Sequence, residues 1–166
     1  MFTIREVTEL AVQIESNGEN VYRQVAALAS DPELKALLEE LAREEGQHAR
    51  WFRRLGESDC GDFCHRGDED ELETMGRALL TEMLGQQTFS LDAEELQSAE
   101  TMAAVIAQAT EFERDTIVFY EMLSDFIGEA EVKDRLSEII AEEKSHIHRL
   151  NGFLERPSPS SVGVQQ

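Results

Sequence analysis

The chain has little cysteine, little proline and little positive charge, and each shortage limits the folds or partners that are compatible with the sequence. Two cysteines among 166 residues are too few for the disulfide framework of a small secreted domain. Three prolines leave room for long uninterrupted helices. Only 15 Lys and Arg residues stand against 35 Asp and Glu residues, and the net charge of −20 argues against nucleic acid and anionic membranes as partners.

Long apolar runs are also missing. The chain has no run of about 18 apolar residues, so we expect no membrane-spanning helix. The start, MFTIREVTEL, lacks the basic region and apolar run of a signal peptide, so we expect a cytoplasmic protein. A chain of 166 residues with 41% apolar residues is long enough for one domain with a substantial core.

Four segments carry apolar residues at alternating spacings of three and four, which predicts helices that pack in a bundle. In the first segment this stripe contains Ala11, Ile14, Val21, Val25 and Leu28, which we expect to face inward. The predicted helices span about 3–29, 32–55, 98–127 and, after a stop at Gly128, the residues up to about 154.

The connections between these helices predict the fold class. The first two helices are joined tightly at Ser30-Asp31-Pro32, and the last two at Gly128, so each pair forms an antiparallel hairpin. A crossover of about 57–97, with a polar start and a short helix near 71–84, joins the hairpins. Such a crossover predicts an all-α, ferritin-like four-helix bundle over residues 1–155. The tail 156–166 reads as flexible, and the crossover is long enough for two chains to exchange hairpins.

The two hairpins repeat each other. A shift of 98 residues places Glu15 on Glu113 and Tyr22 on Tyr120. The same shift places the pair Glu45 and His48 on Glu143 and His146. The chain contains four histidines and two tyrosines in all, so chance is a poor explanation for this match.

The repeated acidic residues and histidines occupy core positions of the predicted helices. Buried, unpaired charges would cost several kcal/mol each, and these stripes hold too few basic residues to pair them. Two divalent metal ions would cancel four carboxylate charges. Glu and His at i and i+3 share one helix face, so each Glu-x-x-His pair can hold one ion, while the other two glutamates either bridge or complete the ligand sets. The predicted ligands are Glu15, Glu45, His48, Glu113, Glu143 and His146. Oxygen-rich ligand sets with one His each suit iron or manganese, although zinc can occupy such a site in a purified sample.

Tyr22 and Tyr120 lie two turns after their glutamates on the same helix faces. They are candidates to hold the ligand carboxylates or to supply protons, and core aromatics with a bonded hydroxyl are the alternative. Gly18 stands in the middle of a helix, where it leaves room for an exogenous ligand or for close helix packing.

The loop sequence Cys60, Cys64 and His65 fits neither a haem attachment motif nor a zinc knuckle. We interpret these residues as ordinary loop cysteines with a neighbouring histidine, and a metal or redox role is the alternative. His148 lies off the core stripe and is expected to be exposed.

The motifs resemble the rubrerythrin branch of the ferritin-like superfamily. The segments AVQIESNGENVYRQVAAL and AQATEFERDTIVFYEML are similar to its first and third helices, and EEGQH and EEKSH to its second and fourth. The resemblance covers residues 3–56 and 98–154 and implies a di-iron site that reacts with peroxide or dioxygen. Rubrerythrins usually carry a further glutamate where this chain has Thr116, and a four-cysteine rubredoxin module where this chain has two cysteines. Electrons would therefore come from a separate donor, such as a rubredoxin-like protein.

Three functions follow as hypotheses. The first is an oxidoreductase that reduces hydrogen peroxide, or dioxygen, at a non-haem di-iron site. The second is iron oxidation for storage, as in bacterioferritin, which has the same ligand set. The third is a metal-binding protein without turnover. We also expect a homodimer, because cages of the storage type use a fifth helix and this tail reads PSPSS.

Overall fold

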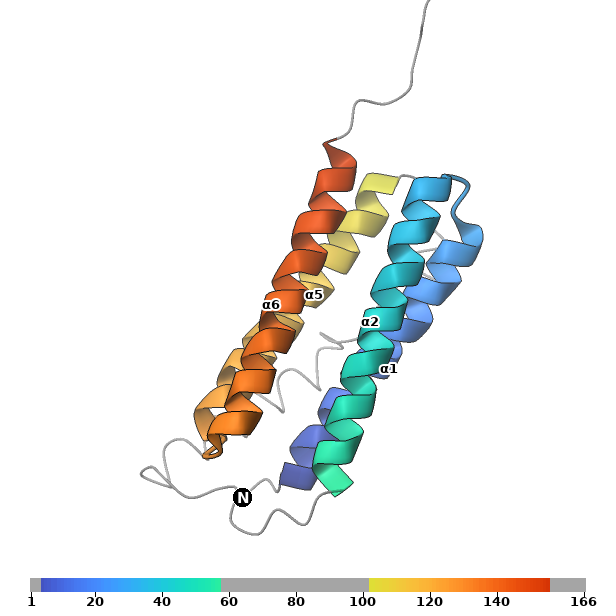
Figure 1. Ribbon diagram of the computed structural model, residues 1–166. Coiled ribbons are helices and arrows are strands. Elements are labelled where there is room, and N and C mark those ends of the chain that lie inside the picture. Colours follow the sequence, from blue (N-terminus) through green and yellow to red (C-terminus); the bar gives the residue numbers. More distant parts are fainter. Residues whose placement is uncertain (1–3, 58–101, 156–166) are drawn as a thin grey trace, which may run out of the picture.

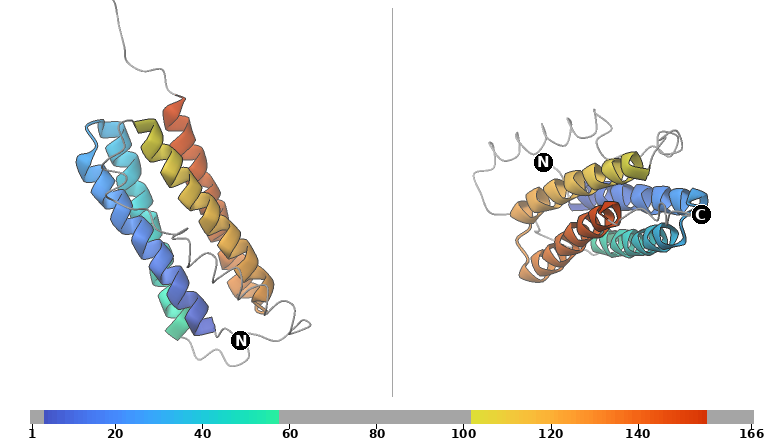
Figure 2. Two further views of the ribbon diagram at one scale, coloured as in Figure 1. Left: turned by 180° about the vertical axis from the view of Figure 1, so that it is seen from behind. Right: turned by 90° about the horizontal axis from the view of Figure 1, so that it is seen from above.

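The computed structural model describes residues 4–57 and 102–155, and every element within these ranges is an α-helix. The helices lie side by side as a four-helix bundle, with the loop of one hairpin at the opposite end from the loop of the other (Figure 1). The view from above shows the first hairpin packed beside the second (Figure 2). The four elements are α1 (Ile4–Leu28), α2 (Pro32–Glu57), α5 (Met102–Phe126) and α6 (Ala130–Leu154).

The turn between α1 and α2 has the capping chemistry that its sequence indicates. The Asp31 side chain accepts hydrogen bonds from the backbone nitrogens of Glu33, at 2.8 Å, and Leu34, at 3.1 Å. These two nitrogens have no partner within the first turn of a helix, so the carboxylate satisfies them. Pro32 takes the first helical position, where its missing N–H costs nothing.

The predicted apolar stripes form the core of the bundle, with one exception at the end of α1. Ala11, Ile14, Val21 and Val25 are buried, but the Leu28 side chain is 60% exposed. The prediction for Leu28 was wrong because it is the last residue of α1, and the periodic stripe there runs past the packed core. The buried residues on the other helices include Leu34, Leu38, Leu41, Phe52, Val105, Phe112, Phe119, Leu123, Val132, Leu136, Ile139 and Leu150.

Several sequence-based predictions fall outside the described residues. These are most of the crossover, the short helix near 71–84, the Cys60, Cys64 and His65 motif, and the tail 156–166. His148 is exposed, as predicted. Among the helices that the structure describes, none combines the length and the apolar character needed to cross a bilayer.

Candidate metal centre

Six acidic and imidazole side chains converge in the interior of the bundle. Each hairpin contributes one glutamate from its first helix and a Glu-x-x-His pair from its second. All six side chains are at most 1% exposed. The structure thus brings together every ligand that the sequence predicts: Glu15 on α1, Glu45 and His48 on α2, Glu113 on α5, and Glu143 and His146 on α6.

The six residues form two overlapping groups, each able to surround one metal ion. One group is Glu15, Glu45, His48 and Glu143, and the other consists of Glu45, Glu143, His146 and Glu113. Within each group the potential ligand atoms all lie within 4.8 Å of one another. Glu45 and Glu143 belong to both groups, so the glutamates of the Glu-x-x-His pairs are the ones placed to bridge. The sequence had left this open.

The polar atoms at the centre of the cluster fit metal ions better than they fit each other. Most inward-facing oxygens and both Nδ1 atoms make no acceptable hydrogen bond to any described residue. Buried polar atoms without hydrogen bonds are costly, so such a concentration calls for a missing partner. Two divalent cations would satisfy these atoms and cancel the charge of four carboxylates. The atoms are Glu15 Oε2, both oxygens of Glu45 and of Glu143, Glu113 Oε2, His48 Nδ1 and His146 Nδ1.

Both imidazole rings turn the same nitrogen towards the centre. His48 Nδ1 lies 2.9 Å from Glu143 Oε1 and 3.4 Å from Glu15 Oε2. His146 Nδ1 lies 2.8 Å from Glu143 Oε2 and 3.1 Å from Glu45 Oε1. The Nδ1 atoms are therefore the ones available to metal ions, and the Nε2 atoms face outward.

Each outward-facing Nε2 donates to a glutamate on the opposite hairpin. His48 Nε2 on α2 lies 2.6 Å from Glu142 Oε2 on α6, and His146 Nε2 on α6 lies 3.0 Å from Glu44 Oε2 on α2. Such carboxylates orient a metal-binding imidazole and make its other nitrogen a stronger metal ligand. Sequence reasoning missed both, although the signal was available: each stands directly before a predicted ligand, and the shift of 98 residues places Glu44 on Glu142.

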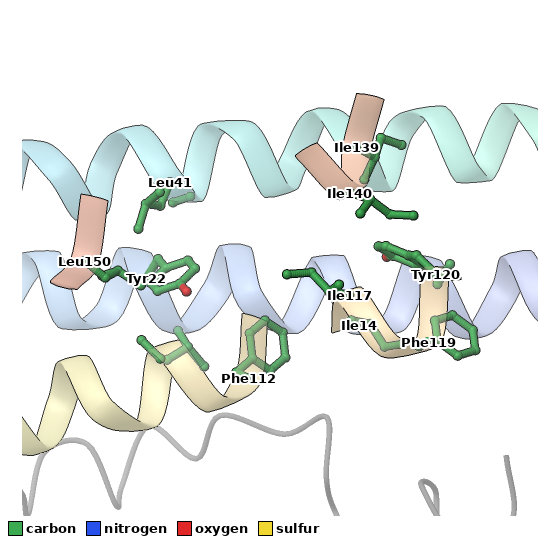
Figure 3. Close-up of a cluster of buried hydrophobic side chains, with 14 of the residues drawn as sticks. Ile14, Tyr22, Leu41, Phe112, Ile117, Phe119, Tyr120, Ile139, Ile140 and Leu150 are labelled. Atoms are coloured by element: carbon green, nitrogen blue, oxygen red, sulfur yellow. The ribbon is translucent and has the colours of Figure 1, made fainter. Parts of the chain in front are cut away.

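The two tyrosines also cross between the hairpins. The Tyr22 hydroxyl donates to Glu113 Oε1, and the Tyr120 hydroxyl donates to Glu15 Oε1. Both rings are buried and belong to the cluster of hydrophobic side chains drawn in Figure 3. Each tyrosine thus holds the glutamate of the other half, not the glutamate on its own helix.

Burial and neighbouring charges shift the pKa values of the cluster. Burial, with the nearby charge of Glu143, raises the pKa of Glu113 to about 8 and also raises the pKa of Glu15 and Glu45. Burial would also raise the pKa of Glu143, but its contacts with the two imidazoles lower it. For His48, the carboxylates of Glu143 and Glu15 outweigh the effect of burial and raise the pKa to about 12. Without metal, the centre therefore holds protons that a cation would displace.

Gly18 and Thr116 are related by the repeat but meet the centre differently. A Cβ atom at Gly18 would lie 2.8 Å from Glu45 Oε2 and 3.1 Å from Phe112 Cε1. Thr116 is fully buried, and its hydroxyl donates to the backbone oxygen of Phe112 at 3.0 Å. Gly18 therefore leaves space for the carboxylate of Glu45, and Thr116 turns its polar atom to its own helix.

Comparisons with known proteins identify the fold and the family of this chain. A crystal structure from Thermotoga maritima, of a protein described as ferritin-like and diiron-carboxylate, matches with a TM-score of 0.64 over 92% of this chain and 94% of that chain. At 21% sequence identity, this likeness shows the fold and confirms the ferritin-like bundle. No curated protein matches the chain. The sequence model of the rubrerythrin family matches residues 6–154. This match extends over nearly the whole chain, and the chain therefore belongs to the rubrerythrin family.

Proposed function

We propose that this chain is a non-haem di-iron oxidoreductase that reduces hydrogen peroxide. The observation that carries the proposal is the pair of overlapping buried ligand groups that share Glu45 and Glu143. Two metal ions that share ligands lie close enough to act together on one small molecule. Iron fits the ligand chemistry, because each group offers three carboxylates and one imidazole and no sulfur.

When bound, two ferrous ions would supply one electron each, which together with two protons reduce one hydrogen peroxide to two water molecules. The protein's own part is to bind, orient and shield. The six ligands are almost completely inaccessible to bulk water, which strengthens every electrostatic interaction among them.

The tyrosines act as positioning residues in this proposal. Burial, with the adjacent charge of Glu113, raises the pKa of Tyr22 well above its ordinary value, and burial with Glu15 does the same for Tyr120. Both hydroxyls therefore keep their protons and remain donors to Glu113 and Glu15. This favours a role in holding the carboxylates over a role in supplying protons.

Repeated turnover needs an external source of electrons. Each cycle leaves two oxidised ions, and the chain contains only two cysteines, too few for the four-cysteine module that could reduce them. We propose a separate donor, such as a rubredoxin-like protein, as the reductant.

Two other functions remain as alternatives that the same experiment distinguishes. Iron oxidation for storage uses dioxygen and ends in a ferric mineral, and a metal-binding protein without turnover reacts with neither oxidant. Thr116, which replaces the further glutamate usual in rubrerythrins, is the specific observation that keeps these alternatives open.

Stopped-flow oxidation of the diferrous protein tests the proposal. We expect hydrogen peroxide to oxidise it faster than dioxygen does, and turnover to require an added reductant. The variant His146→Ala should lose turnover because it removes one nitrogen ligand. His148→Ala is the matched control, since His148 is exposed and two residues away. Faster reaction with dioxygen followed by a ferric mineral signal would support storage, and no reaction with either would support simple metal binding.

A further inference from the structure

The two halves of the metal centre are related by the repeat, but their surroundings are not. The carboxylate behind each histidine has a repeat partner, Glu44 matching Glu142. Arg149, which contacts Glu44, has no such partner, because the same shift places Arg149 on Trp51. The outer environment of His146 therefore differs from that of His48.

Arg149 binds the same oxygen that His146 uses. Arg149 Nη1 lies 2.8 Å from Glu44 Oε2, the atom that also accepts the bond from His146 Nε2 at 3.0 Å. A second ion pair, 2.7 Å from Arg149 Nη2 to Glu40 Oε2, fixes the guanidinium in place. The Arg149 side chain is 26% exposed, so water screens this interaction only in part.

The corresponding contact of His48 is shorter, and the neighbouring arginine contacts a different oxygen of the carboxylate. His48 Nε2 lies 2.6 Å from Glu142 Oε2. The nearest arginine, Arg135, contacts the other oxygen, Oε1, at 3.4 Å, and it is held mainly by Glu138 at 2.8 Å. Arg149 therefore shares Glu44 Oε2 with His146, whereas Arg135 approaches the oxygen of Glu142 that His48 does not use.

This difference bears on how strongly each histidine binds a cation. A carboxylate that accepts from one imidazole nitrogen raises the basicity of the other nitrogen. A guanidinium that shares the accepting oxygen withdraws part of that negative charge, and its own charge also opposes a nearby cation. His48 should be the stronger ligand and His146 the weaker one.

We propose that Arg149 makes the two metal positions unequal, so that the first ion binds on the His48 side and the second on the His146 side. The inference rests on the metal-binding part of the proposed function and adds an order of filling to it. Arg149 acts through Glu44 and His146, so it is a positioning residue and not a ligand.

Locating the first ion tests the order directly. The metal-free protein is loaded with one equivalent of Co²⁺, crystallised, and examined by anomalous diffraction at the cobalt edge. We expect the stronger peak beside His48. Equal peaks, or a stronger peak beside His146, would overturn the proposal. The position of the ion decides, because two ions that repel each other would bind in two steps whichever side is filled first.

Variants of Arg149 test the cause. In Co²⁺ titrations followed by calorimetry, Arg149→Gln should strengthen the second binding step by about tenfold, the lower end of the effects seen for outer partners of metal ligands, and leave the first step unchanged. Arg149→Lys keeps the positive charge and should stay close to the unmodified protein. A weaker second step in Arg149→Gln would show that holding Glu44 in place matters more than its charge, and would overturn the proposal.

Arg43→Gln is the matched control. Arg43 also lies beside Glu44, but it approaches the other oxygen, Oε1, at 3.6 Å and its side chain is 60% exposed. Arg43→Gln should leave both binding steps unchanged, and an equal effect from both variants would overturn the specific role of Arg149.

Cobalt binding is measured without peroxide, so a protein that binds Co²⁺ in this order but does not reduce peroxide would refute only the proposed reaction. A protein that binds no Co²⁺ would refute the order and the metal centre together.

Discussion

At the scale of single residues, the glycine in the middle of α1 has a physical explanation. Glycine costs a helix interior about 1 kcal/mol relative to alanine, and the sequence alone offered two reasons to accept that cost. The structure adds a third reason, because a Cβ atom at Gly18 would lie 2.8 Å from the carboxylate of Glu45, a predicted metal ligand, and 3.1 Å from the Phe112 ring. Because that carboxylate ends a flexible side chain, it would move before the helices did.

We therefore predict that Gly18→Ala leaves the stability of the metal-free protein nearly unchanged, because the gain of about 1 kcal/mol in helix propensity is offset by the displacement of Glu45, and that it weakens metal binding. Displacement of a shared ligand should lower Co²⁺ affinity by at least about tenfold, measured by titration calorimetry. Gly152→Ala is the control, since nothing lies within 4 Å of its added Cβ, and it should leave binding unaltered. Equal Co²⁺ affinity in Gly18→Ala and the unmodified protein would show that Gly18 serves helix packing instead.

At the scale of elements, each Glu-x-x-His pair works because α2 and α6 are continuous through the centre. The pair at i and i+3 keeps both side chains on one face only while the helix is regular. The start of α2 depends on Asp31, whose side chain accepts from two backbone nitrogens. This cap lies about four turns before Glu45 and His48.

Replacing this cap should destabilise the protein without touching the metal ligands. We predict that Asp31→Ala lowers the free energy of unfolding by about 1 kcal/mol, the usual cost of losing an N-cap. Asp31→Asn should retain most of the stability, because an amide oxygen can accept the same bonds. Urea unfolding of the metal-free proteins measures both, and equal losses in the two variants would point to the charge of Asp31 and not to its capping bonds.

At the scale of the whole molecule, the metal centre links stability to pH. Burial raises the pKa of Glu113 to about 8 and also raises the pKa of Glu15 and Glu45. The folded metal-free protein therefore binds protons that the unfolded chain releases above about pH 4.5. His48, with its pKa raised to about 12, likewise keeps a proton in the folded protein that the unfolded chain releases above about pH 6.5. Glu143 has a lowered pKa, so its contribution to stability is complete above about pH 4.5 and does not change between pH 6 and pH 8.

The stability of the metal-free protein should therefore fall as the pH rises from 6 to 8, by about 1.4 kcal/mol per pH unit for each extra proton bound by the folded state. Metal ions displace these protons, so the increase in melting temperature caused by Co²⁺ should be larger at pH 8 than at pH 6. Thermal unfolding with and without Co²⁺ measures this difference. An increase that is independent of pH would mean that the ligands are already deprotonated before metal binds.

The expected homodimer also belongs to this scale. It rests on the tail sequence and the long crossover, and it remains a prediction. Light scattering should give a mass near twice 18.8 kDa. A much larger, cage-like particle would contradict the prediction and favour the storage function, whereas a monomer would contradict the dimer alone.

The amino-acid sequence by itself determined the helices, the bundle and the six converging residues. Helical periodicity is local, so the stripes of α1, α2, α5 and α6 and the i, i+3 pairs can be read without knowing how the helices meet. The repeat between Glu15 and Glu113 then indicated that the two hairpins meet as equivalents.

Only the tertiary structure decided the relations between helices. It showed that Glu45 and Glu143 are the shared residues, that Tyr22 reaches the glutamate of the other hairpin, and that Arg149 stands behind one histidine only. It also showed that Leu28 lies outside the core. Each of these depends on how far one helix is rotated and shifted against another. That rotation and shift are set by packing between segments distant in the chain, and no local pattern records them.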